Sequence, residues 1–110
     1  FMEAGCPATA FLCINDMVAI GLIQALAEKG IKVPEDVSVV GFDDIPLAGA
    51  YIPALTTVHC PAQEMGRLAA IMLLDSMRSP EAAMSVTMRL SPKLMVRHST
   101  AAPKSELHKK

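Results

Sequence analysis

Short apolar runs and a helical pattern alternate along the first part of the chain. Residues 8–14 (ATAFLCI) and 37–42 (VSVVGF) are almost wholly apolar, and polar or turn-forming residues bound each run. Runs of this length and composition predict strands that are buried on both faces. Between them, residues 17–27 carry apolar side chains at helical spacing, with Gln24, Glu28 and Lys29 on the opposite side. The order strand, helix, strand predicts a βαβ unit with two parallel strands.

The predicted helix has signals at both of its ends. Asn15 and Asp16 precede it, and both residue types cap helices because a side-chain oxygen accepts from the free N–H groups of the first turn. We expect Asp16 to act as a cap rather than as a ligand. Gly30 follows the helix and predicts a residue in the left-handed conformation there.

The second half of the chain continues the α/β pattern. Residues 45–53 predict an irregular loop, residues 55–59 a third strand, and Pro61 to about Met77 a helix, because proline fits the first helical position. Two strand-like segments follow, residues 84–90 and 93–99, separated by Ser91 and Pro92. The fold class is therefore α/β with a parallel sheet, over residues 1–100, and residues 101–110 form a polar tail.

Composition and charge exclude several classes of function. The chain has 110 residues, with 10 basic and 11 acidic side chains, and without a basic stripe these residues are not expected to bind nucleic acid by themselves. Apolar residues make up 52% of the chain, yet no apolar run approaches the roughly 20 residues of a membrane span, so no membrane partner is expected. The apolar excess suggests surfaces that another part of a larger protein covers, and a start at Phe1 rather than methionine predicts a fragment.

The three cysteines do not form a recognisable site. Cys6, Cys13 and Cys60 are odd in number and lack C-x-x-C spacing, which argues against a disulfide framework or a structural zinc ion. We expect reduced thiols, a cytoplasmic location, and neither a metal nor a cofactor.

Two polar side chains follow consecutive strands of the predicted sheet. Asn15 comes after the first strand and Asp43 after the second, and ligands of open parallel sheets bind beyond the carboxyl ends of the strands. A carboxylate accepts hydrogen bonds from hydroxyl groups, and an amide both donates and accepts. The pair therefore predicts a sugar, a nucleoside or a similar small polar ligand. The sequence leaves open that Asn15 only caps the helix, and that one of Asp43 and Asp44 is structural in an Asx-type turn.

Catalysis is not predicted. His59 and Cys60 are neighbours, so in an extended chain their side chains point to opposite faces and cannot form a nucleophile–base pair. Asp43 and Asp44 are also adjacent, and neighbouring residues rarely converge on one reacting atom. His98 is expected to be an exposed or hydrogen-bonded histidine near the tail. We therefore expect a protein that is not an enzyme.

Three segments together resemble the effector-binding domain of the lactose-repressor/galactose-repressor family of transcription regulators. They are FLCINDMVAIG (residues 11–21), GIKVPEDVSVVGFDD (residues 30–44) and YIPALTTV (residues 51–58). The third segment is followed by a Pro-x-x-x-Met-Gly helix and by the closing LMVRHST (residues 94–100). The resemblance extends from about Pro7 to Thr100. It implies a periplasmic-binding-protein-like fold of two α/β lobes, of which this chain is an incomplete, C-terminal part.

The resemblance also implies how the chain is organised and which residues contact the effector. Asn15 and Asp43 are implied ligands of a small-molecule effector, and Cys60 stands where the family usually has glutamine or another long polar residue. The chain is expected to cross between lobes at His59-Cys60 and near Ser91-Pro92, so the Pro61–Met77 helix and the Met84–Leu90 strand would belong to the other lobe. Effector binding would shift the relative orientation of the lobes and alter DNA binding through an N-terminal helix-turn-helix that these residues lack.

A homodimer is a further implication of the resemblance. Ile20, Ile23, Gln24 and Tyr51 match the dimer-forming surface of the family, although the spacing of Ile20 and Ile23 is equally typical of core residues. Two alternatives to the regulator remain open at this point. One is a periplasmic solute-binding protein, which shares the fold, and the other is a truncated chain that acts only by dimerising with intact partners or has no activity.

Overall fold

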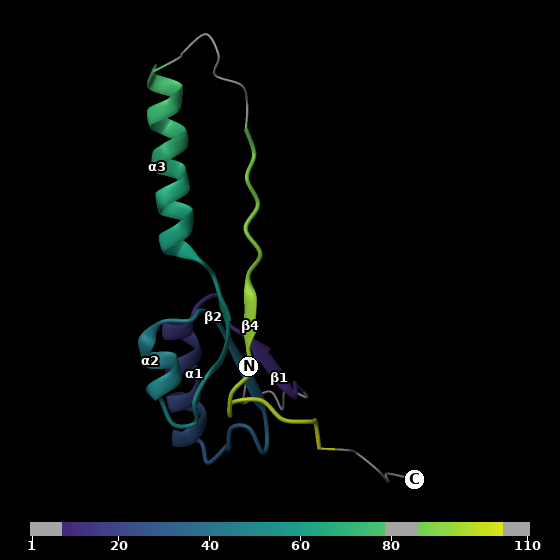
Figure 1. Cartoon of the computed structure of the whole chain (residues 1–110). Coiled ribbons are helices and arrows are strands. Elements are labelled where there is room, and N and C mark those ends of the chain that lie inside the picture. The colour runs from purple at the N-terminus through teal and green to yellow at the C-terminus, as the bar shows by residue number, and fades with distance from the viewer. Residues whose placement is uncertain (1–7, 79–85, 105–110) are drawn as a thin grey trace. The chain divides into compact units, whose positions relative to one another are not determined.

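The computed structural model describes residues 8–78 and 86–104, which form an α/β arrangement (Figure 1). The strands are β1 (Ala10–Leu12), β2 (Ser38–Asp43), β3 (Thr56–His59) and β4 (Lys93–Met95), and the helices are α1 (Asp16–Glu28), α2 (Pro46–Ala50) and α3 (Ala62–Arg78). The four strands form one sheet in the order β1-β2-β3-β4. The predicted fold class, a parallel-sheet α/β fold, is confirmed.

Two parallel strand pairs set the register of the sheet, and the sequence predicted the first of them, between β1 and β2. Phe11 of β1 pairs with Val39 of β2, and Asp43 of β2 pairs with His59 of β3, both in parallel ladders. Because parallel strands run in the same direction, the carboxyl ends of β1, β2 and β3 meet at one edge of the sheet. This edge carries the polar residues that the sequence singled out.

The prediction that the first two strands are buried on both faces was wrong. Leu12 is 77% exposed and Phe42 is 38% exposed, whereas Val39 is fully buried. The described helix α1 packs on β2, and its apolar side chains cover only the face that carries Val39. The opposite face, with Leu12 and Phe42, has no such cover among the described residues.

Helix α1 begins and ends where its sequence signals predict. Asn15 is the N-cap, and its side-chain oxygen accepts a hydrogen bond of 2.9 Å from the N–H of Val18. At the other end, Gly30 has a φ of 73°, and the N–H of Ile31 donates to the carbonyl of Leu26 over 2.9 Å. This is the Schellman arrangement, in which a left-handed residue lets the chain satisfy the last carbonyls of a helix.

The segment predicted as an irregular loop, residues 45–53, contains the short helix α2. Pro46 occupies the first turn, where its missing N–H costs nothing, and Ala48 is fully buried. Ala48 belongs to a core made of residues from α1, α2, β2 and the positions just before β2 and β3: Ala19, Ile20, Ile23, Leu26, Val37, Val39, Ala48 and Leu55.

The predicted helix after Pro61 is confirmed as α3, and none of its residues is buried. Its apolar residues Leu68 and Met72 line a hollow of about 400 Å³ together with Met88 and Leu90. The predicted strand over residues 84–90 is not present as a strand: residues 86–90 have no regular structure, and residues 84 and 85 lie outside the described part. The predicted strand over residues 93–99 is limited to the three residues of β4.

Two compact units divide the chain, and their boundaries fall after His59 and after Lys93. The first boundary coincides with the crossing predicted at His59-Cys60, and the second lies one residue after Ser91-Pro92. The smaller unit contains α3, and the larger one contains α1, α2 and strands β1 to β3. Within residues 8–78 and 86–104, no helix combines the length and apolar character that crossing a membrane requires.

Candidate ligand-binding site

A buried aspartate organises the edge of the sheet at which the strands end. The Asp16 side chain is fully buried, and one of its oxygens accepts a hydrogen bond from the Thr57 hydroxyl while the other accepts from the N–H of Ile45 over 2.8 Å. The expectation that Asp16 caps α1 was therefore wrong, because Asn15 takes that position. Asp16 instead joins the start of α1 to β3 and to the loop after β2.

The close approach of Asp16 explains a glycine in β2. A side chain at Gly41 would collide with an oxygen of Asp16, and its Cβ would lie 2.9 Å from a methyl carbon of Leu55. Only glycine leaves room for a carboxylate against the strand. The G-F-D-D segment therefore combines a packing requirement at Gly41 with the polar residues that follow it.

Asn15 lies directly after β1 and is partly exposed. Its Oδ1 atom is engaged in the helix cap, as one of the two interpretations of the sequence proposed. The Nδ2 group makes no hydrogen bond to the described residues, and it remains available as a donor to a ligand. Capping and ligand binding are thus compatible at this residue, because they use different atoms of the amide.

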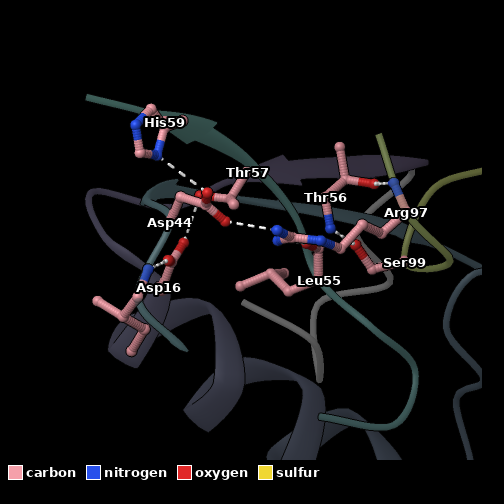
Figure 2. A network of polar contacts seen from close by, with 9 residues as sticks. Asp16, Asp44, Leu55, Thr56, Thr57, His59, Arg97 and Ser99 are labelled. Carbon is pink, nitrogen blue, oxygen red and sulfur yellow. Dashed lines mark hydrogen bonds and ion pairs between the residues drawn. The ribbon is translucent and has the colours of Figure 1, made fainter. Parts of the chain in front are cut away.

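The two aspartates after β2 have different environments. Asp43 is exposed, and its carboxylate makes no hydrogen bond within residues 8–78 and 86–104. Asp44 is only 13% exposed, and it pairs with both Arg97 and His59 (Figure 2). As predicted for one member of this pair, Asp44 is structural, although its partners are these side chains and not the loop N–H groups of an Asx turn.

The backbone at these aspartates is unusual. Asp43 has a φ of 106° and Asp44 has a φ of 58°, and a non-glycine residue in such a conformation costs about 1–3 kcal/mol. Surrounding contacts have to compensate for this cost, and strain of this kind is concentrated at functional sites. Both aspartates share this strained turn, and of the two only the Asp43 carboxylate has no hydrogen-bond partner among the described residues.

The Asp44 carboxylate lies between a guanidinium and an imidazole, as Figure 2 shows. Its Oδ1 accepts from Arg97 Nη2 over 2.6 Å, and its Oδ2 lies 3.0 Å from Nδ1 of His59. A carboxylate only accepts hydrogen bonds, so Nδ1 of His59 carries the proton. Burial alone would raise the pKa of Asp44, but the hydrogen bonds from Arg97 and His59 outweigh it and hold that pKa below its ordinary value.

The structure brings only some of the predicted ligand residues together. Asn15 and Asp43 lie at the carboxyl ends of hydrogen-bonded neighbouring strands, β1 and β2. His59, which was expected only at the crossing, lies at the same edge as the register partner of Asp43. Cys60 follows directly in the chain, is partly exposed, and belongs to the smaller compact unit.

The residues of the predicted dimer surface separate into two groups. Ile20 and Ile23 are each 5% exposed and pack in the core, which agrees with the alternative that the sequence left open. Gln24 is exposed and Tyr51 is half-buried, and both line a surface groove of about 610 Å³, to which Ile23 also contributes. Ile52, which is 90% exposed, lies in the same groove and was not identified from the sequence.

Metal and thiol chemistry have little support in the described part of the chain. No group of three histidine, cysteine, aspartate or glutamate side chains with metal-binding geometry occurs there. Cys13 and Cys60 are both free thiols, and burial raises the pKa of Cys13. A thiol that is protonated and partly buried is a weak nucleophile.

Comparison with known proteins places this geometry among transcription regulators. Residues 2–100 match the model of the periplasmic binding protein-like domain. The HTH-type transcriptional repressor PurR of Haemophilus influenzae (strain PittEE) is 41% identical over 93 residues, which are 83% of this chain and 28% of the repressor.

Solved structures agree with the sequence match. A LacI family transcriptional regulator from Enterococcus faecium with bound ribose superposes with a TM-score of 0.82 at 36% identity, over 91% of this chain and 37% of that one. A dimeric Lac repressor with an 11-residue C-terminal deletion gives a TM-score of 0.82 at 35% identity, over 93% of this chain and 37% of that one. The chain thus spans less than two fifths of the length of these relatives.

Proposed function

The chain belongs to the periplasmic binding protein-like domain family as part of the effector-binding domain of a LacI-type transcription regulator, and on this basis we propose that it binds a small polyhydroxylated effector at the carboxyl edge of β1 and β2. The observation that carries the proposal is the Asp43 carboxylate. It is exposed, without a hydrogen bond to the described residues, and held in a strained turn at this edge. A carboxylate in this state is ready to accept hydrogen bonds from ligand hydroxyl groups.

The proposed ligand is of sugar or nucleoside type. A relative of similar fold has ribose bound, and ribose is both a sugar and the sugar part of ribonucleosides. Asp43 would accept hydrogen bonds from adjacent hydroxyl groups, and the Nδ2 group of Asn15 would donate one. Cys60 would contact the effector only weakly, because a thiol is a poor hydrogen-bonding group compared with an amide.

The proposed mechanism is a ligand-dependent shift between two states of the whole regulator. Effector binding would favour one arrangement of the two lobes, and operator binding by a helix-turn-helix encoded outside these residues would change in response. The effector biases this equilibrium only through its different affinities for the two states, which typically amounts to about 1–3 kcal/mol. In this proposal the regulator acts in the cytoplasm, as a homodimer that forms through the surface with Gln24 and Tyr51.

Replacement of Asp43 tests the ligand site directly. In the full-length protein that carries this sequence, we expect isothermal titration to detect binding of D-ribose or adenosine, and we expect Asp43→Asn to weaken it about tenfold or more. The expected loss follows from the about 1.5–3 kcal/mol that a hydrogen bond to a charged group contributes.

Glu28→Gln is the matched control, because Glu28 is an exposed carboxylate at the other end of α1. It should leave the affinity unchanged. The proposal is wrong if neither ligand binds the unmodified protein, or if Asp43→Asn binds as tightly as the unmodified protein does.

A further inference from the structure

The turn at Asp43 and Asp44 needs a partner that holds it in place. Both residues have positive φ angles, and the exposed Asp43 side chain contributes no hydrogen bond within the described residues to compensate for them. The compensation must come from neighbouring groups. Asp44 supplies it, because its carboxylate is 13% exposed and both of its oxygens have partners.

Arg97 is the more firmly held of these two partners. Its side chain is 21% exposed, whereas that of His59 is 48% exposed. Its Nη1 donates to the carbonyl of Leu55 over 2.9 Å while its Nη2 donates to Asp44. The planar guanidinium thus connects the backbone just before β3 to the strained turn.

The backbone of Arg97 is fixed as well. Its N–H donates to the Thr56 hydroxyl over 2.9 Å, and two residues later Ser99 is buried between β2 and β3, where its hydroxyl donates to the carbonyl of Val39 over 2.6 Å. An arginine held at both its backbone and its head group loses little entropy when it binds a carboxylate. It therefore forms a rigid support for Asp44.

We propose that Arg97 is a positioning residue of the ligand site: through Asp44, it holds the turn in the conformation that presents the Asp43 carboxylate to the effector. The inference rests on the proposed function in so far as Asp43 contacts the effector. Arg97 itself does not touch the ligand in this proposal. Its effect on affinity passes entirely through the orientation of Asp43.

The first experiment measures D-ribose affinity by isothermal titration on the full-length protein. Arg97→Met should weaken binding about tenfold. Arg97→Lys should give a smaller loss, because lysine retains the charge but cannot bind Leu55 and Asp44 with one planar group. Arg67→Met is the matched control, since Arg67 forms an exposed ion pair with Glu64 on α3, and it should leave the affinity unchanged.

A double variant separates positioning from a general loss of structure. If Arg97 acts through Asp43, then Arg97→Met should cost less than twofold in affinity when it is made in the Asp43→Asn background. A tenfold loss in both backgrounds would overturn the proposal, as would an Arg97→Met protein that binds D-ribose as tightly as the unmodified one.

The second experiment needs no ligand and therefore distinguishes this inference from the proposed function. Amide hydrogen exchange of residues 42–45 should become at least tenfold faster in Arg97→Met and, to a smaller degree, in Arg97→Lys, and should not change in Arg67→Met. Unchanged exchange in both Arg97 variants would overturn the inference even if D-ribose binds. If D-ribose and adenosine fail to bind the unmodified protein, the proposed function is wrong, and the exchange rates still decide whether Arg97 holds the turn. Should Arg97→Met fail to fold, Arg97→Lys carries both measurements.

Discussion

At the scale of single residues, the edge of the sheet depends on a buried carboxylate next to a glycine. Asp16 has no exposed surface, and its partners are a hydroxyl and a backbone N–H. A buried carboxylate is tolerated only when its oxygens are satisfied in this way. Gly41 makes the arrangement possible, because any larger residue would displace Asp16 from these partners.

Gly41→Ala should therefore be strongly destabilising. The added methyl group would meet Asp16 and Leu55, and overpacking together with a disturbed buried hydrogen bond is expected to cost about 3 kcal/mol. Thermal unfolding of the full-length protein measures this loss. Gly21→Ala is the control: nothing lies within 4 Å of a Cβ at that helical position, so it should be neutral or slightly stabilising. Equal melting temperatures for the two variants would show that Gly41 has room for a side chain.

At the scale of elements, the Asp44 carboxylate connects segments that are far apart in the sequence. It joins the end of β2 to His59 in β3 and to Arg97 after β4. Ser99 and Thr56 extend this connection, since the Thr56 N–H donates to the Ser99 hydroxyl over 2.8 Å. The returning chain is thereby attached to β2 and β3, the two central strands of the sheet, and the Arg97 side chain reaches from it to Asp44.

The lowered pKa of Asp44 predicts a specific dependence of stability on pH. Because that pKa lies below its unfolded value of about 4, the stabilisation is complete above about pH 5 and is lost as the pH falls through the folded pKa. Asp44→Asn should lower the melting temperature at pH 7 and flatten its decline between pH 5 and pH 3.

Glu64→Gln removes the carboxylate of the exposed pair with Arg67, where solvent screens the charges, and should change the curve less. An Asp44→Asn protein with the same pH curve as the unmodified one would show that the Arg97 contact contributes no stability.

At the scale of the whole molecule, the larger compact unit presents a groove beside α1 and α2. Gln24, Tyr51 and Ile52 line it, together with the apolar residues Ile31 and Val33. Ile52 is 90% exposed, and a contiguous apolar surface of this kind often marks a contact with another protein. A relative of similar fold is a dimeric repressor. These observations support the proposal that a second copy of the protein covers the groove.

Ile52→Lys should weaken the proposed dimer. A lysine in an apolar contact removes the apolar surface that isoleucine would bury and adds a charge that must be desolvated. The dimer dissociation constant should therefore rise about thirtyfold or more. Sedimentation velocity over a concentration series measures it. Val96→Lys, at an aliphatic residue that is 70% exposed and outside the groove, should have no effect. A dimer that forms equally well with Ile52→Lys would exclude this surface.

The sequence by itself determined the order of β1, α1, β2, β3 and α3, the parallel pairing of β1 and β2, both ends of α1, and the edge at which Asn15 and Asp43 lie. These features have local signals in the sequence, because apolar periodicity identifies strands and helices, and capping residues and a glycine identify the ends of a helix. The sequence did not predict the short helix α2, and it predicted a strand where the described residues 86–90 have no regular structure. Only the tertiary structure decided that Asp16 is buried, that Leu12 is exposed, and that Asp44 pairs with Arg97. Such contacts join residues far apart in the chain, and no local spacing encodes which side chains packing will bring together.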